Sequence, residues 1–148
     1  MNETNQDPEL FLFFTEIGII EQLTRARLES LLPDNMKMSH FALLNHLVRL
    51  GGEWSPARLA AALQVTRAAI TNTLNRLEAR GLVEIETDPD DGRAKLVSLT
   101  AAGKSRRDAC VDNIKPLLVE LEDRFGREFF VNALPQLQEL RIYLDQHR

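Results

Sequence analysis

The sequence predicts a mainly α-helical fold with six helices and a small two-stranded β-hairpin, and three observations lead to this prediction. The regions near both ends of the 148-residue chain carry apolar residues at helical spacing. Residues 59–81 contain two short helical patterns joined by a turn at Gln64–Val65. Two alternating apolar and polar stretches then flank Asp88–Gly92, a run rich in turn-forming residues. Two short helices followed by such a hairpin are typical of a winged helix-turn-helix.

Residues 1–7 are polar and expected to be frayed, and the first predicted helix spans residues 9–32 and ends before Pro33. Its main apolar stripe follows three-and-four spacing and consists of Leu10, Phe14, Ile17, Leu23, Leu28 and Leu31. Further apolar residues lie off this stripe, namely Leu12, Phe13, Ile19 and Ile20. A helix that is apolar on more than one face is usually buried on more than one face. In a chain this small, the pattern predicts packing against a partner subunit.

Capping residues mark the next two helices. Ser39 is the expected N-cap of a helix that ends at Gly51–Gly52. Ser55–Pro56 supplies an N-cap followed by a proline at the first helical position. This pair predicts the start of a short helix over Ala57–Leu63.

The fourth helix and the hairpin follow directly. Thr66 caps the fourth helix through its hydroxyl group, and Gly81 ends it in a left-handed conformation. Residues 82–86 and 97–99 alternate as strands do, with the turn at residues 88–92 between them. A short hairpin is therefore predicted immediately after the fourth helix.

Two apolar helices are expected at the C-terminal end. Thr100 caps the first, which runs to Phe125 with a kink at Pro116, and its stripe is Val111, Ile114, Leu117, Leu118 and Leu121. Gly126 separates it from the last helix, in which Pro135 is expected to cause a second bend. The residues of the last helix that are expected to point inward are Phe129, Phe130, Leu134, Leu137 and Leu140.

This pattern divides the chain into two regions. Residues 8–36 and 104–147 are expected to form a helical dimerisation region, and residues 37–103 a winged helix-turn-helix domain that binds DNA. Terminal helices with more apolar surface than one subunit can cover imply an intertwined homodimer. One recognition helix covers few base pairs, so such modules act in pairs on half-sites about one helical turn apart. A closed two-fold dimer would match a palindromic operator.

The charge of the chain is distributed unevenly. The net charge is −4, but residues 51–107 contain nine Lys or Arg and seven Asp or Glu, so this stretch carries +2 and the remainder −6. Phosphate binding depends on the local potential, so an acidic protein can still bind double-stranded DNA with one face. The small local excess predicts modest non-specific affinity.

The segments LAAALQVTRAAITNTLNRLEARGLVE and DPDDGRAKLVSLTAAG resemble the multiple antibiotic resistance regulator (MarR) family of bacterial transcription factors. The resemblance is strong across Ser39–Gly103, and it continues to both ends as a pattern of helices. It implies an obligate dimer that binds a palindrome, usually as a repressor. It also implies release by a small-molecule effector, often aromatic and anionic, or by oxidation.

The resemblance also implies roles for single positions. Thr66 begins the recognition helix, and its DNA-facing side follows as Arg67, Ala68, Thr71, Asn72, Asn75 and Arg76. In the wing, Asp91 corresponds to a brace and Arg93 to a probe of the minor groove. Gly92 stands where the family often has a second arginine, so we expect the tip of the wing to bind more weakly and to be more mobile.

The residues themselves support the same assignment. Ile70, Leu74 and Leu77 share one helix face and are expected to form core, while the opposite face carries amides, hydroxyls and arginines. Asparagine can bond an adenine edge and arginine a guanine edge, although most contacts in such interfaces go to phosphate. For Arg76 we favour phosphate. The alternative is a solvated helix face.

The two cations of the wing, Arg93 and Lys95, are expected to contact a DNA groove. They could instead be a charged edge that discourages strand pairing between molecules. Asp91 is expected to act as a turn former that bonds nearby backbone or Arg93.

The resemblance also implies an effector pocket between the dimerisation helices and the winged module, and the residues expected to line it are Phe14, His40, Leu43 and Trp54. An ordinary residue at a helix N-terminus is the alternative for His40. Cys110 is expected to be a buried small apolar residue, with Asp108 and Asp112 raising its pKa. The peroxide-sensing branch of the family that the chain resembles relies on a cysteine in its first helix. No cysteine precedes Cys110 here, which argues against a thiol sensor.

The remaining function classes find little support. We find no nucleophile–base pair and no glycine-rich phosphate loop, so the chain is not expected to be an enzyme or to need a cofactor. His46 and His147 lack metal-ligand spacing, and no signal peptide or membrane span is apparent, which predicts a cytoplasmic protein. The sequence thus predicts a DNA-binding regulator. The alternative is a winged-helix scaffold that binds another protein and has little affinity for DNA.

Overall fold

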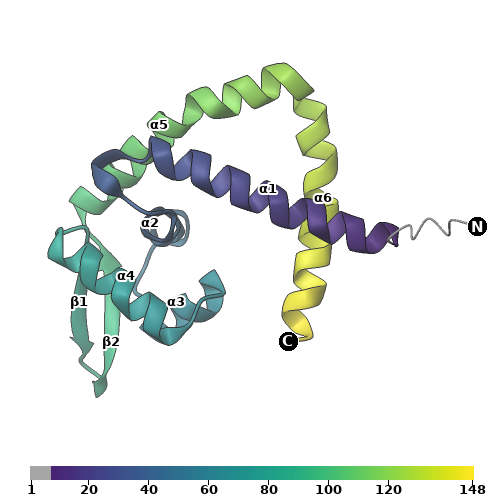
Figure 1. The fold of residues 1–148 in the computed structure, drawn as a ribbon. Helices are drawn as coiled ribbons and strands as arrows, with labels where there is room; N and C mark the ends of the chain where they lie inside the picture. Colours follow the sequence, from purple (N-terminus) through teal and green to yellow (C-terminus); the bar gives the residue numbers. More distant parts are fainter. Residues whose placement is uncertain (1–7) are drawn as a thin grey trace, which may run out of the picture. The chain divides into compact units, whose positions relative to one another are not determined.

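The computed structural model describes residues 8–148 (Figure 1), so the expectation for residues 1–7 lies outside the described part. This part contains six α-helices, one short 3₁₀ helix and one antiparallel hairpin, which confirms the predicted fold class. The order is α1 (Glu9–Leu31), η1 (Pro33–Asn35), α2 (Met38–Leu50), α3 (Pro56–Leu63), α4 (Arg67–Ala79), β1 (Val83–Asp88), β2 (Asp91–Leu99), α5 (Ala101–Phe125) and α6 (Arg127–Gln146). The chain forms two compact units, one that ends at Asn113 and one that spans Ile114–Arg148.

The core of the first unit is built around α2, α3, α4 and the hairpin. Its fully buried side chains are Met36, Leu43, Leu44, Leu47, Leu59, Ile70, Leu77, Leu82, Val83, Val97 and Cys110. Trp54 adds a short third partner to the hairpin, because its backbone N–H donates to the Val97 carbonyl at 2.9 Å and its carbonyl accepts from Val97 N at 2.8 Å. The wing is therefore held to the segment that leads into α3.

Three capping predictions are confirmed. The Ser55 hydroxyl accepts a hydrogen bond from Arg58 N at 3.2 Å, and the Thr66 hydroxyl accepts one from Ala69 N at 3.1 Å. Gly81 follows α4 with φ of 69°, the left-handed conformation that glycine adopts without steric cost. These caps set where α3 and α4 begin and where α4 ends.

The prediction for the start of α2 is wrong. The helix begins at Met38 with Lys37 as its N-cap, so Ser39 lies inside the first turn. The imidazole of His40 makes the cap bond, because its Nδ1 accepts a hydrogen bond from the Lys37 backbone N–H at 3.1 Å. Met38 N also has a partner in the Glu29 carboxylate of α1, at 3.2 Å. A carboxylate from a neighbouring helix and a histidine three residues on thus replace the expected serine.

The hairpin is longer than predicted. Its strands reach Asp88 and Asp91, so only Pro89 and Asp90 lie between them, whereas we expected the whole run 88–92 to be loop. Backbone groups make the ladder, and turn-forming side chains do not prevent pairing where they are exposed. The 3₁₀ turn η1 after Leu32 was not predicted either.

The start of α5 is fixed by a close approach of two backbone segments. As expected, Thr100 caps α5, and its hydroxyl accepts from Gly103 N at 2.9 Å and donates to the Gly81 carbonyl at 2.7 Å. A Cβ atom on Gly103 would overlap the Leu82 carbonyl oxygen and lie 2.7 Å from Leu99 Cδ1. Only glycine fits here, where the end of α4, the start of β1 and the first turn of α5 meet.

The long helices α5 and α6 continue through their prolines, Pro116 and Pro135. Gly126, with φ of 82°, separates them as expected. No helix in the described part of the chain is long and apolar enough to cross a membrane.

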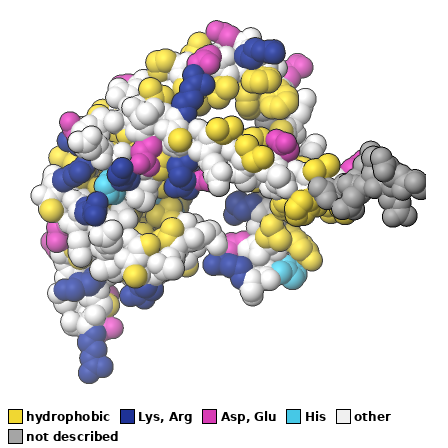
Figure 2. Space-filling model, viewed as in Figure 1, with side chains coloured by type: hydrophobic (Ala, Val, Ile, Leu, Met, Phe, Trp, Pro, Cys, Tyr) yellow, Lys and Arg dark blue, Asp and Glu magenta, His cyan; other side chains and the backbone are white. Residues whose placement is uncertain are grey.

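The terminal helices expose much of their apolar surface. In α1, most large apolar side chains are 36% to 76% exposed, Leu28 and Leu31 are half-buried, and none is buried. The expectation that apolar residues of α6 point inward is wrong for the single chain, since Phe129, Phe130, Leu134 and Leu137 are exposed and Leu140 is half-buried. Hydrophobic side chains accordingly form part of the visible surface in Figure 2. The second unit, Ile114–Arg148, consists of two helix segments and has too little other apolar surface to cover these side chains of α6.

Replacement of Gly103 by alanine should destabilise the protein. The added methyl group must displace the Leu82 backbone or the Leu99 side chain, which we expect to cost about 1–3 kcal/mol of unfolding free energy. Urea unfolding followed by circular dichroism measures this. Gly92→Ala is the matched control, because its Cβ would meet nothing within 4 Å. Equal stability of the two variants would contradict the proposed close contact.

Stability should fall as the pH decreases through the ordinary range of histidine. Burial lowers the pKa of His40, and the nearby Arg80 and Arg76 guanidinium groups lower it further. The unfolded chain therefore binds a proton at a higher pH than the folded one, so folding is favoured above the unfolded pKa. Stability is lost from about pH 7 towards about pH 5.

His40→Gln should reduce the slope of this loss, although the variant itself is less stable because the cap of α2 is altered. Part of the slope should remain, since burial also lowers the pKa of His46. Wild type measured in the same buffers is the reference. Unfolding free energies at several pH values measure both slopes, and an unaltered slope in His40→Gln would exclude this role for the histidine.

Candidate nucleic-acid interface

Helix α4 has one buried face and one exposed face. Its buried residues are Ile70, Thr73, Leu74 and Leu77, which confirms the predicted core positions. The seven residues expected to face DNA from this segment are all exposed: Thr66, Arg67, Ala68, Thr71, Asn72, Asn75 and Arg76. Within the described residues, no hydrogen bond or ion pair engages the side chains of Arg67, Asn72, Asn75 and Arg76. Their donors and acceptors are therefore available to a partner molecule.

A hydrogen bond within the wing fixes the backbone at Arg93, one of its two exposed cations. The pairing passes from Thr87↔Lys95 directly to Asp88↔Asp91, so residues 92–94 bulge out of the ladder. The Asp91 carboxylate accepts a hydrogen bond from Arg93 N at 3.0 Å, which confirms Asp91 as a turn former that bonds nearby backbone. The side chains of Arg93 and Lys95 are both exposed. In Figure 1 the hairpin extends away from the helices of the module.

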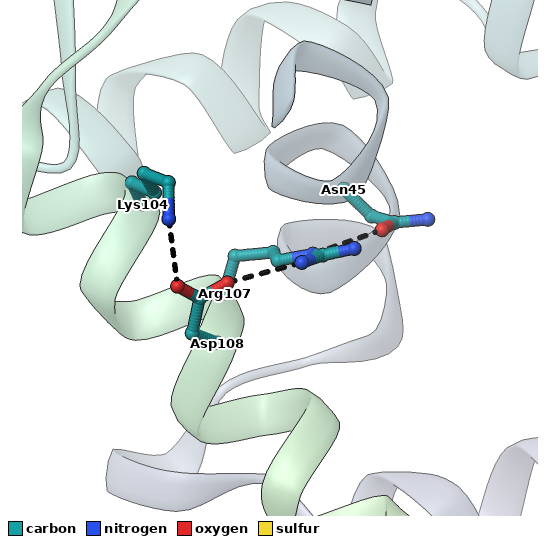
Figure 3. Close-up of polar contacts among 4 residues, drawn as sticks. All are labelled: Asn45, Lys104, Arg107 and Asp108. Atoms are coloured by element: carbon teal, nitrogen blue, oxygen red, sulfur yellow. Dashed lines mark hydrogen bonds and ion pairs between the residues drawn. The ribbon is translucent and has the colours of Figure 1, made fainter. Parts of the chain in front are cut away.

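A network of polar side chains ties α5 to α2 behind this surface (Figure 3). Arg107 Nε donates to Asn45 Oδ1 at 3.1 Å, and Arg107 Nη1 lies 3.0 Å from Asp108 Oδ1. Lys104 Nζ lies 3.0 Å from the second oxygen of Asp108. Hydrogen bonds from Lys104 and then Arg107 hold the pKa of the Asp108 carboxyl below its usual range. The two ion pairs lie within α5 and, being partly exposed, add little stability. The hydrogen bond from Arg107 to Asn45 is the contact of this network that joins α5 to α2.

Arg58, an exposed cation in α3, was not among the residues predicted to contact DNA. Its guanidinium carbon lies 4.3 Å from the centre of the Trp54 ring, a cation–π arrangement. Trp54 is itself fixed, because its indole N–H donates to the Gly51 carbonyl at 2.8 Å and its ring packs against His46 at 4.5 Å. A Trp–Arg spacing of four residues at the start of a helix is the signal that would have identified this pair.

The four residues of the expected effector pocket lie in different environments. Leu43 is fully buried and His40 is 3% exposed, with its imidazole capping α2, whereas Phe14 is 46% exposed. This position of His40 fits the alternative interpretation, an ordinary residue at a helix N-terminus. Trp54 packs between Arg58 and His46. A pocket lined by these four residues stays a prediction.

A cavity with a different lining lies in the first unit. It has a volume of about 190 Å³ and is bounded by α1, α2, α3 and α4 through Arg25, Met38, Ser39, Ala42, Leu63, Val65, Ala69, Ile70 and Thr73. Its wall is mostly apolar, with one guanidinium and two hydroxyl groups. Arg25 Nε lies 2.6 Å from Glu21 Oε1 on the same helix. Because Ala69, Ile70 and Thr73 belong to α4, any molecule in this cavity would touch the inner face of that helix.

Cys110 is completely buried, as expected. Its thiol lies 3.8 Å from the Met36 sulfur, and burial raises its pKa. The expected acidic neighbours are wrong: the carboxylate that raises this pKa further is Asp34, and Arg106 opposes it. A buried, protonated thiol is unsuited to redox sensing. Among the described residues, no group of histidine, cysteine and carboxylate side chains could hold a metal ion.

Comparison with known proteins points to one family. The model of the MarR family matches residues 34–94. Wild-type MarR from E. coli, solved in its apo form, is 26% identical, has a TM-score of 0.72, and aligns over 85% of this chain and 94% of its own. A cysteine-to-serine mutant of the same protein, solved with operator DNA, is 25% identical with a TM-score of 0.77 over 95% of this chain and 99% of its own.

A third relative shares the fold at lower identity. The organohalide-sensing transcriptional regulator RdhR, solved with 2,4-dichlorophenol, is 21% identical with a TM-score of 0.79 over 98% of this chain and 86% of its own. The winged module thus matches the model of the MarR family, and most of the chain is similar in fold and sequence to MarR, a transcriptional regulator.

Proposed function

We propose that this protein is a homodimeric transcriptional repressor that binds a palindromic DNA operator and is released by a small aromatic or anionic effector. The observation that carries the proposal is the outer face of α4. It exposes amide and guanidinium groups that have no partner among the described residues, beside a wing whose cations are also exposed. Such groups on a helix fit the donor and acceptor pattern of the major groove.

In this arrangement α4 is the recognition helix. Asn72 and Asn75 present amides that can bond base edges, each such pair discriminating by about 1–3 kcal/mol. Arg76 would contact phosphate. The MarR structure with operator DNA supports this use of the fold. The wing would reach the adjacent minor groove with Arg93, where narrow A·T-rich segments attract arginine.

The homodimer is supported by the uncovered apolar helices. The exposed apolar side chains of α1 and α6 would remain in water in a single chain, a cost that pairing with a second copy removes. A closed two-fold dimer presents two copies of α4 to two half-sites. A repressor would then act by occupying the DNA that the transcription machinery needs.

The effector proposal rests on the cavity behind α4. Its volume has room for one substituted aromatic ring, and Arg25 offers a cation to an acidic group. The RdhR structure with 2,4-dichlorophenol supports a small aromatic effector. A bound ring would press on Ala69 and Thr73 and so change the orientation of the recognition helix.

The experiment that tests this function selects DNA from a random duplex library with the purified full-length protein. We expect a palindrome with half-sites about one helical turn apart, and a dimer in size-exclusion chromatography with light scattering. If no sequence is enriched even at low salt, where weak electrostatic binding is strongest, the alternative of a protein-binding scaffold replaces the proposal.

Loss of the wing cation should weaken DNA binding in a salt-dependent way. Arg93→Ala should lower affinity for all duplexes and reduce the slope of log K against log salt by about 1. Fluorescence anisotropy titrations at several salt concentrations measure this slope. Arg141→Ala in α6 removes the same charge outside the winged module and serves as the control. An unchanged slope in Arg93→Ala would remove Arg93 from the interface.

Filling the cavity should make the release of DNA less sensitive to the effector. Ala42→Leu adds an isopropyl group to a residue that lines the cavity, and we expect DNA affinity to stay within about twofold of wild type. Release of DNA by an aromatic carboxylate, with benzoate as the probe, should require at least tenfold more ligand. Ala61→Leu on the exposed surface of α3 is the control. Equal sensitivity of both variants to benzoate would place the effector elsewhere.

A further inference from the structure

The turn between α1 and α2 has an unusual backbone. Asp34 and Asn35 both have left-handed conformations, with φ of 54° and 55°. Side chains disfavour this region, and two such residues in succession persist only where their surroundings hold them. Neither residue is a glycine, so contacts with the surroundings must stabilise the left-handed conformation. Asp34 makes such contacts.

Asp34 contacts two helices that are far apart in the sequence. Its carboxylate oxygen Oδ2 lies 2.9 Å from Arg106 Nη1 in α5. Its backbone carbonyl accepts a hydrogen bond at 3.3 Å from Nη1 of Arg80, the residue that ends α4. One residue therefore links the first turns of α5 to the C-terminal end of the recognition helix.

The rest of this turn is anchored to α1 and α5. The Leu31 carbonyl accepts from Asn113 Nδ2 at 3.0 Å, and buried Met36 contacts Cys110. Lys37 pairs with Glu29 of α1 at 3.1 Å. The turn is thus attached to both helices, and the bond from Arg80 to Asp34 connects α4 to that assembly.

We propose that Asp34 is a positioning residue that sets the orientation of α4 relative to α1 and α5, and so the spacing of half-sites that the dimer accepts. This proposal rests on the proposed function, because the two recognition helices act as a pair only in a DNA-bound dimer. Half-sites must lie about one helical turn apart for both helices to dock. A small rotation of α4 about its C-terminal end therefore changes which spacing fits.

The partly exposed ion pair adds little to stability, so its loss should leave the fold intact. Asp34→Asn is the informative variant, since asparagine tolerates the left-handed conformation and keeps the backbone carbonyl while the charge is lost. Arg80→Gln removes the donor at the end of α4. Asp123→Asn, at an exposed position in α5, loses the same charge and is the matched control.

The first readout needs no DNA. Amide hydrogen exchange at Gly81 and Leu82, whose N–H groups bond to the last turn of α4, should be at least threefold faster in Asp34→Asn and Arg80→Gln. Exchange at Leu59 in α3 should match wild type, whereas a general loss of stability would accelerate both sites. Unchanged exchange at Gly81 and Leu82 overturns the proposal.

The second readout uses the selected palindrome and the same duplex with one base pair inserted between its half-sites. Wild type and Asp123→Asn should prefer the original spacing, and Asp34→Asn should lose at least threefold of that preference. Faster exchange with an intact spacing preference overturns the positioning role. If wild type selects no palindrome, the proposed function fails, and the exchange experiment still decides whether Asp34 holds α4.

Discussion

Burial of the inner face of α4 is the constraint on which the rest of the winged module depends. Ile70, Leu74 and Leu77 pack into the core, and this leaves Asn72, Asn75 and Arg76 on the outside. Because side chains on a helix are fixed relative to one another, burying one face orients the opposite face as well. Packing of the core is therefore enough to turn the amides of Asn72 and Asn75 towards the outside.

A second constraint lies where α4, β1 and α5 meet. Thr100 joins the Gly81 carbonyl to the first turn of α5, and Gly103 allows the Leu82 backbone to come close. The wing and the long helix α5 are therefore positioned by the same few atoms that end the recognition helix. The contacts of Asp34 with Arg106 and Arg80 form a second link between α5 and the end of α4.

The charge distribution of the chain fits the proposed reversible binding of DNA. The chain is acidic as a whole, while Arg67, Arg76 and Arg93 are exposed on the winged module and make no side-chain hydrogen bond or ion pair within the described residues. Local charge attracts phosphate, and the overall negative charge limits non-specific association. In the proposed function, Gly92 leaves the wing with fewer charges, so we expect specific contacts of α4 to supply much of the affinity for DNA.

The sequence by itself determined the order of the helices and the place of the hairpin. It also determined the caps that depend on residues a few positions apart: Ser55 and Thr66 cap α3 and α4, and Gly81 ends α4. It also determined the face of α4, since helical periodicity separates apolar from polar positions. Only the tertiary structure decided that His40 is buried in the core where it caps α2, and that Asp34 bonds both Arg80 and Arg106. These contacts join segments distant in sequence, or depend on how completely the core covers a side chain, and no local pattern encodes either.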